Sequence, residues 1–318
     1  MYDELKDDIN AAFKTDEFIC FEKNNTNANC DFLLPFVSSE NDKPKGKILW
    51  SEVLEKENDI LDSIFSWYEC DICFHYLFPT ILQHCLENNF SDDDVLMCLM
   101  DRFSPSFFEY GDCSYFNEFS NLSKLQRDVV KDFLLLLESK NTSFQESCTS
   151  ALSALDWLNS RDKLIEIISF NFSKENLFLI EDITSEQEKE GDFLRHSLFN
   201  INWSELATKN NLLLASVIDD YPLLSNKAFL YFIPACMIAT LYDFFDENSN
   251  IPFNTIHNIC YANQRNLKDK FIFEKFNIFS LDQKKAVQAF LELILKTGRS
   301  EKFDRRKIMI SLMEFWAK

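Results

Sequence analysis

The sequence predicts a mainly α-helical fold made of two tandem homologous helical domains, with room for a few short strands. Apolar residues recur at helical spacing, as at Leu122, Leu125, Val129 and Phe133. Only four of the 318 residues are glycine, and no two of them are close together. Because the phosphate-binding loops of Rossmann and P-loop folds need clustered glycines, we do not expect either fold.

An internal repeat predicts the two domains. Short blocks of similar sequence recur in the same order, and their offset drifts slowly between 153 and 159 residues, as short loop insertions would produce. The matching landmarks are Trp50 and Trp203, Pro79 and Pro234, Gln126 and Gln283, and Trp157 and Trp316. We therefore predict a strongly acidic N-terminal copy over residues 1–160 and a nearly neutral C-terminal copy over 161–318.

Individual elements follow from periodicity and from end signals. Leu5, Ile9 and Phe13 recur as Leu164, Ile168 and Phe172, which is a weaker match between the two copies. Ser91 is followed by three aspartates, which predicts a helix start, since serine caps the first turn and carboxylates favour its dipole. Further helices are predicted at 122–137, 279–294 and 305–318, a short strand at 175–183, and loops at 22–48, 103–118, 183–200 and 246–256.

Two prolines stand in apolar runs with the shared pattern Phe-x-Tyr-x-x-Pro. Pro79 and Pro234 either lie inside a helix and free a carbonyl one turn earlier, or open a helix in its first turn. Gln126 and Gln283 are polar residues on otherwise apolar faces. An unpaired buried amide costs on the order of 1–3 kcal/mol. We therefore expect each glutamine to pair with backbone near the proline of its own copy.

These landmarks resemble a family of small bacterial proteins of unknown function. Its members carry a Trp near the start of the core, an aromatic-Leu-Pro-Ala helix and a C-terminal Gln…Phe-Leu helix. The second copy matches these as WSEL from Trp203, YFIPA from Tyr231 and QKKAVQAFL from Gln283, whereas the first copy has Thr80 in place of the alanine. The resemblance implies no activity. Proteins of this general kind resemble the inhibitors that bacteria carry next to toxin genes.

Among candidate reactive groups, Cys70-x-x-Cys73 with His75 is the strongest metal or redox motif. The matching positions of the second copy hold Ser225, Ala228 and Leu230. None of these can replace a thiolate or an imidazole, so buried thiols are the better interpretation. The four histidines have no paired spacing, and no serine stands in a GxSxG turn. We predict no catalytic residue, no metal site and no cofactor.

The charge of the chain is unevenly divided between the two copies. Residues 1–160 hold 30 acidic and 12 basic residues, a net charge of −18, whereas 161–318 hold 22 and 20, a net charge of −2. Within 50–118 there are 15 acidic residues and two basic ones. Carboxylates often do no more than solvate a surface. If the copies share a fold, however, folding does not explain the difference, so we predict a specialised acidic face.

An acidic face repels nucleic acid and anionic membranes and attracts basic proteins. We expect a cytoplasmic immunity protein that binds and neutralises a basic toxin acting in the cytosol, without catalysis, nucleic acid or membrane as a partner. The acidic N-terminus lacks a signal core. The alternative is an enzyme with a carboxylate- and cysteine-lined site in the N-terminal half. The predicted partner-binding residues are Asp59, Asp62, Glu69, Asp71, Asp92, Asp93, Asp94, Asp101, Glu109, Asp112 and Glu118.

Overall fold

The computed structural model is mainly α-helical, as the sequence predicts, and helices account for most of the residues that it describes. The chain separates into two compact units, unit 1 (Met1–Leu158) and unit 2 (Asn159–Lys318). The structure describes residues 2–13, 17–19, 47–49, 71–103, 119, 122–173, 183–184, 189–208, 211, 213–214, 223–246, 248–260, 276–297 and 303–317.

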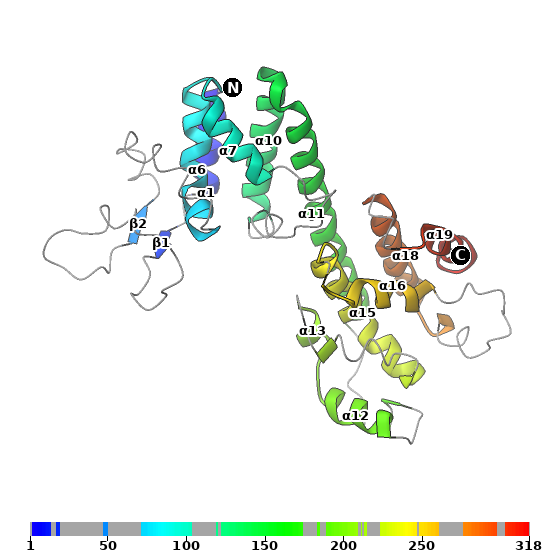
Figure 1. The fold of residues 1–318 in the computed structure, drawn as a ribbon. Helices are drawn as coiled ribbons and strands as arrows, with labels where there is room; N and C mark the ends of the chain where they lie inside the picture. Colours follow the sequence, from blue (N-terminus) through cyan, green and yellow to red (C-terminus); the bar gives the residue numbers. More distant parts are fainter. Residues whose placement is uncertain are drawn as a thin grey trace, which may run out of the picture. The chain divides into compact units, whose positions relative to one another are not determined.

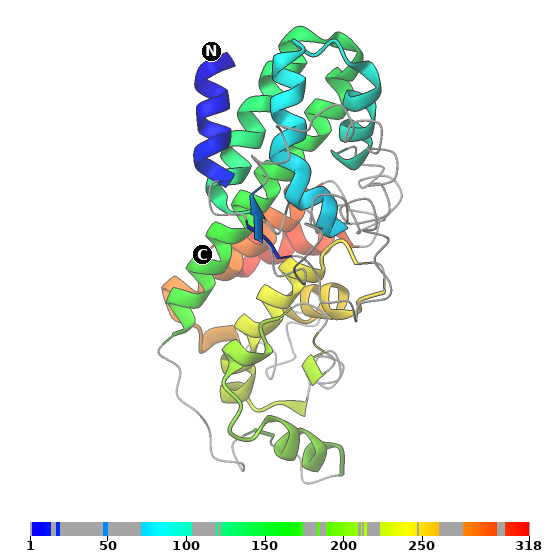
Figure 2. The same cartoon turned by 90° about the vertical axis from the view of Figure 1, so that its left-hand side faces the viewer.

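Unit 1 is built on helices that lie side by side (Figures 1 and 2). Helix α1 (Tyr2–Phe13) packs against both α6 (Asp71–Glu87) and α10 (Lys124–Lys140), and α6 also packs against α7 (Asp93–Phe103). The strands β1 (Glu17–Ile19) and β2 (Lys47–Leu49) form an antiparallel pair. The 3-10 turn η2 (Thr142–Phe144) leads into α11 (Gln145–Phe172), whose residues belong partly to unit 1 and partly to unit 2.

Phenylalanine side chains join these helices in the core of unit 1. Phe78 of α6 meets Phe13 of α1 and Phe103 of α7 edge-on, with ring centroids 5.9 and 5.3 Å apart. Phe103 also stacks on Phe119 at 4.7 Å. Large aromatic side chains bury much apolar surface each, and edge-on pairs add a further attraction. The many phenylalanines of the sequence therefore supply the core, as their number suggests.

Unit 2 has one central helix. Helix α15 (Asn226–Asp243) is buried at every position from Tyr231 to Leu241, and it packs against α13 (Trp203–Leu206) and α16 (Ile251–Cys260). Burial on all sides explains why its sequence is apolar all round. The other elements are α12 (Lys189–Leu198), α18 (Leu281–Lys296), α19 (Arg305–Ser311) and the π-helical turn η6 (Leu312–Trp316), which packs on α18.

Both prolines lie inside helices, so the structure selects the first of the two readings. Pro79 is an interior residue of α6, and Pro234 is an interior residue of α15. An interior proline lacks the N–H that would bond to the carbonyl four residues earlier. Both prolines are buried. Packing on all sides of these segments therefore holds together two helices that propensity alone would break.

Gln126 and Gln283 are buried, but their side-chain oxygens do not pair where the sequence analysis expected. Each oxygen accepts a hydrogen bond from the backbone N–H of a capping serine, Ser123 or Ser280, at 2.8 and 2.9 Å. Each serine hydroxyl in turn accepts from the backbone N–H of the glutamine. Both helices thus begin with a capping box, which satisfies two otherwise unpaired donors at the helix start. These oxygens therefore bond at the helix starts, and pairing of the glutamine amide nitrogens with backbone near the prolines stays a prediction.

Two predicted loops contain helices. Helix α12 occupies most of the predicted loop 183–200, and α16 begins inside the predicted loop 246–256. In α12 only Gly191, Leu194 and Leu198 are buried among the residues whose side chains are described, so its apolar stripe is narrow and easily missed. In α16, Pro252 stands in the first turn, where proline is tolerated. The predicted strand at 175–183 lies almost entirely outside the described residues.

Matching landmarks of the two copies occupy similar elements. The prolines lie inside long buried helices, the glutamines stand third in capped helices, and Trp157 and Trp316 are both buried. Leu5, Ile9 and Phe13 are buried on α1, and their counterparts Leu164, Ile168 and Phe172 are buried on α11. Homology of the two units stays a prediction. Among the helices described, none combines the length and the apolar character needed to cross a membrane.

Candidate functional site

The structure gives side-chain positions for three of the eleven predicted partner-binding acids, Asp92, Asp93 and Asp94. Asp71 begins α6 and Asp101 lies on α7, but only their backbone is described. Asp93 and Asp94 are exposed in the first turn of α7. The remaining six lie outside the described residues: Asp59, Asp62, Glu69, Glu109, Asp112 and Glu118.

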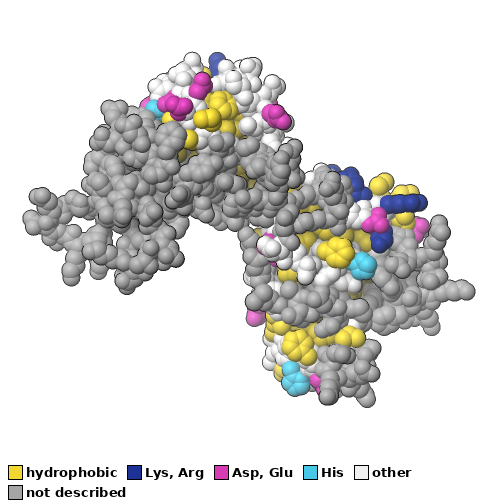
Figure 3. Space-filling view, in the orientation of Figure 1, with side chains coloured by type: hydrophobic (Ala, Val, Ile, Leu, Met, Phe, Trp, Pro, Cys, Tyr) yellow, Lys and Arg dark blue, Asp and Glu magenta, His cyan; other side chains and the backbone are white. Residues whose placement is uncertain are grey.

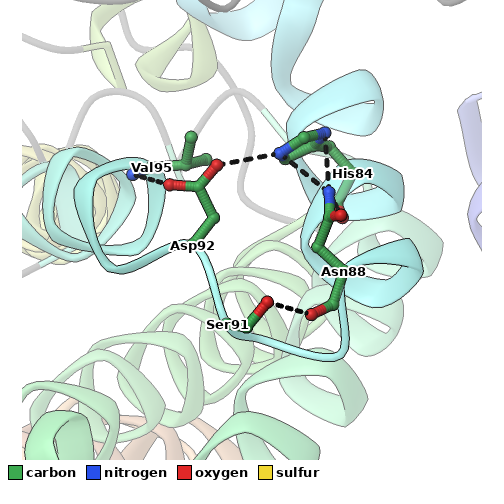
Figure 4. A network of polar contacts seen from close by, with 5 residues as sticks. All are labelled: His84, Asn88, Ser91, Asp92 and Val95. Carbon is green, nitrogen blue, oxygen red and sulfur yellow. Dashed lines mark hydrogen bonds and ion pairs between the residues drawn. The ribbon is translucent and has the colours of Figure 1, made fainter.

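Asp92 has a structural role at the start of α7 (Figure 4). Its Oδ1 accepts a hydrogen bond from the backbone N–H of Val95 at 3.2 Å, which caps the helix. Its Oδ2 lies 3.1 Å from Nε2 of His84, a side chain on α6 that is only 7% exposed. Asn88 lies beside the same imidazole, with Nδ2 3.0 Å from Nε2. Asp92 therefore ties α7 to α6, and its carboxylate is only partly available to a partner.

The turn between α6 and α7 fixes the position of this network. Asn89 and Phe90 have φ values of 50° and 57°, in the left-handed region that residues with a side chain seldom occupy. Phe90 is nevertheless buried, with its ring centroid 5.5 Å from that of Phe133 and 6.2 Å from that of Tyr2. Burial of this ring offsets the strain of the turn. Asp93 and Asp94 are thus presented to solvent from a firmly placed helix start.

A second acidic face, which the sequence analysis did not select, lies on α10 and α1. Asp128 and Asp132 are exposed on α10, and Asp8 of α1 is close enough to Asp132 to act on it electrostatically. Leu125 and Leu135 stand on either side of this pair along α10 and are 57% and 45% exposed. Leu125 was expected on the buried face of the helix. Gln126 takes that position instead, and Leu125 points to solvent.

The carboxylates of this face lack close partners. No hydrogen bond or ion pair joins Asp128 or Asp132 to another residue in the described parts of the chain. Partial burial, and then the charges of Asp8 and Asp128, raise the pKa of Asp132. The nearby ammonium of Lys131 donates instead to Asp156 of α11 at 2.8 Å. Like charges are thus held together without full compensation, at some cost to stability.

Helix α18 offers a direct comparison, because its positions can also be counted from a capping serine. The positions of Leu125, Asp128, Asp132 and Leu135 on α10 correspond to Asp282, Lys285, Ala289 and Glu292 on α18. There the charges meet internal partners. Lys285 lies 3.5 Å from Asp282, and Gln288 donates to Glu292 at 2.8 Å. The same helix face therefore carries two carboxylates without ion-pair partners between leucines in unit 1, whereas in unit 2 it carries one ion pair and one hydrogen-bonded carboxylate.

The described residues on the face drawn in Figure 3 differ in charge between the two units. On unit 1, Asp and Glu side chains border an area of hydrophobic side chains. On unit 2, Lys and Arg side chains gather over the part of the surface formed by α18 and α19. Arg305, Arg306 and Lys307 are exposed there. The unequal charge of the two halves is thus also visible on the surface.

The described cysteines are structural rather than reactive in character. Four of the five are buried. Burial, and then the charge of Asp92, raises the pKa of Cys85 to about 12, and burial raises that of Cys260 to about 12. Thiols that stay protonated are poor nucleophiles and poor metal ligands. The described residues contain no group of three or more His, Cys, Asp or Glu side chains suited to a metal. Cys70 lies outside the described residues, as do the side chains of Cys73 and His75.

Comparison of the chain with protein-family models, with curated proteins and with solved structures finds no match. The resemblance to a small bacterial family therefore stays a prediction. The function proposed below therefore rests on the charge, exposure and contacts of the described residues.

Proposed function

We propose that the chain is a cytoplasmic, non-catalytic interaction protein that binds and neutralises a basic toxin, as an immunity protein does. The acidic surface of unit 1 would cover the cationic cleft or approach of the toxin. Toxins that act on nucleic acid or other anionic substrates need such cationic surfaces. Basic protein partners are therefore the class that this surface is best suited to capture.

One observation supports the proposal most strongly. Asp8, Asp128 and Asp132 are exposed together on unit 1 with no compensating ion pair among the described residues, while on the corresponding face of α18 Asp282 pairs with Lys285 and Glu292 accepts a hydrogen bond from Gln288. Crowded like charges reduce the stability of the folded state. Retaining them on one unit alone is understandable if a positively charged partner neutralises them in the complex.

The experiment is co-expression in bacteria of the full chain with the product of the adjacent gene, which the proposal expects to be a basic toxin domain. We expect the chain to restore growth, and the purified pair to form a complex. The charge-reversal variant D8K/D128K/D132K should lose protection, because repulsion replaces attraction. The matched variant E166K/D282K/E292K changes the net charge by the same amount on exposed residues of unit 2 and should still protect.

Failure of the wild-type chain to bind or to protect would contradict the proposal, and so would an adjacent gene that encodes a metabolic enzyme. Equal loss of protection in both variants would show that overall charge, rather than the face on unit 1, is responsible. Circular dichroism of both variants checks that each one is folded.

A further inference from the structure

Helix α10 carries an exposed stripe with the spacing of a helix–helix contact. Leu125, Asp128, Asp132 and Leu135 are separated by three, four and three residues and are all exposed. This alternation is the a/d spacing that brings two packed helices together along one seam. The opposite side of α10 is buried, with Val130, Phe133 and Leu137 among the core residues. The helix therefore has one face in the core and a second, narrower face suited to a further helix.

We propose that this face, the α10 stripe, is the docking surface for one helix of the basic partner. The partner helix would lay apolar side chains against Leu125 and Leu135, and place Lys or Arg side chains between them against Asp128 and Asp132. The inference rests on the proposed function, because it specifies how the same acidic surface recognises its partner.

The dimensions of the stripe define the partner segment. Leu125 and Leu135 are ten residues apart on one helix, which corresponds to about 15 Å along its axis. The two carboxylates between them are four residues apart, or about 6 Å. A helix of about three turns spans this length. Its pattern would be two apolar residues at the ends and two cationic residues in the middle, at the same alternating spacing.

Charge selects a basic partner over a second copy of the chain. Two α10 stripes facing each other would bring Asp128 and Asp132 against carboxylates of the same sign, and the chain as a whole carries a net charge of −20. A cationic helix meets no competing ion pair at these two aspartates among the described residues. Lys131, whose charge acts on both aspartates, donates its hydrogen bond to Asp156 instead.

The leucines and the carboxylates have separable roles. Exposed leucines gain free energy when a partner removes them from water, and this contribution depends little on salt. The carboxylates speed association and discriminate against acidic helices, and salt screens their contribution. Truncation of the leucines should therefore speed dissociation, whereas neutralisation of the carboxylates should slow association and weaken its dependence on salt.

The test measures binding of two synthetic helical peptides to the full chain by fluorescence anisotropy at several salt concentrations. One peptide has leucines at its outer seam positions and arginines at the two central ones, and the other has glutamates in place of the arginines. We expect the arginine peptide to bind at least about tenfold more tightly than the glutamate peptide. The variant L125A/L135A should bind the arginine peptide about tenfold more weakly, and the dependence of this affinity on salt should be retained. The variant D128N/D132N should bind the arginine peptide more weakly, and this affinity should depend less on salt.

L281A provides the matched control, since Leu281 is a 61% exposed leucine on α18 of unit 2. This variant should bind the arginine peptide as the wild type does. Equal binding of both peptides would overturn the inference, as would unchanged affinity in L125A/L135A or an equal loss in L281A. Thermal melts establish that the variants are folded.

The same variants separate failure of this inference from failure of the proposed function. If the chain neutralises the toxin and L125A/L135A binds the toxin with unchanged affinity, then the α10 stripe is not the docking surface and the proposed function stands. If the wild-type chain binds neither the toxin nor the arginine peptide, both are wrong.

Discussion

At the scale of single residues, the acids of the sequence differ in what they do for the fold. Asp92 caps α7 and pairs with the buried imidazole of His84. Asp93, the next residue, is exposed, and no hydrogen bond or ion pair joins it to another described residue. A run of three aspartates thus contains one residue that stabilises the fold and neighbours that are available to a partner.

Replacement of Asp92 by alanine should lower the free energy of unfolding by about 1–2 kcal/mol, because it removes a helix cap and leaves His84 without this carboxylate. D93A is the control, and a change of less than about 0.5 kcal/mol is expected there. Urea unfolding of both variants at pH 7 provides the measurement. Equal effects of the two substitutions would contradict the structural role of Asp92.

The sequence predicts a helix start near Ser91 and two buried polar glutamines, but it does not predict which atoms these residues bond to. Ser91 was read as the helix cap because serine commonly caps, whereas the structure gives the capping bond to Asp92. The glutamines were recognised as buried polar residues that need a partner. Their capping boxes were not predicted, because the glutamines were considered as part of an apolar helix pattern and not as residues of the first turn. Pairing of His84 with Asp92 depends on the turn at Asn89 and Phe90, which no sequence pattern predicts.

At the scale of elements, α10 and α18 begin and pack in the same way but differ in their exposed side chains. Both begin with a serine–glutamine capping box and bury one apolar side. Their outer sides differ, since carboxylates on α10 lack ion-pair partners among the described residues and α18 pairs its own charges. The difference affects stability, because the raised pKa of Asp132 reflects a native state that resists ionisation of this carboxyl group.

D132N should therefore raise the melting temperature at pH 7, where the wild-type carboxylate is charged. The sign follows from linkage: a carboxyl group with a raised pKa in the folded state destabilises that state above its folded pKa. Below the ordinary pKa of 3.8 the group is protonated in both states, so the advantage disappears. Because Asp132 is exposed to screening solvent, we expect a gain of roughly 1 °C.

Calorimetry of the wild type and D132N at pH 7 and at pH 3 measures this effect. The control is D93N, which removes an equal charge from the first turn of α7, where a carboxylate favours the helix dipole, so it should not raise the melting temperature. A gain from D132N that persists unchanged at pH 3 would show that ionisation of Asp132 is not its cause.

Helix prediction succeeded where the apolar stripe is wide and failed where it is narrow. The segments 122–137 and 279–294 are predicted as helices because four or more apolar residues recur on one side. Helix α12 was read as a loop because few of its residues face the core. The α10 stripe escaped notice because Leu125 fits the same periodic pattern as the core residues, and one helical position separates a buried side chain from an exposed one.

At the scale of the whole molecule, composition predicted the unequal charge of the two halves but not the residues that express it. All of the predicted partner-binding acids lie within residues 50–118, where basic residues are scarcest. The described acidic face instead combines Asp8 with Asp128 and Asp132, about 120 residues further along the chain. Only the packing of α1 against α10 brings these carboxylates together. A count of charges within one stretch of sequence cannot predict that carboxylates so far apart along the chain share one face.

The central claim is that unit 1 captures a basic protein through its exposed carboxylates. The most direct measurement is the affinity of the full chain for the basic toxin domain at increasing salt, for the wild type and for D8N/D128N/D132N. We expect the wild-type affinity to fall steeply with salt, and the variant to bind more weakly with a flatter salt dependence. Equal affinities and equal salt dependence in the two proteins would contradict the central claim.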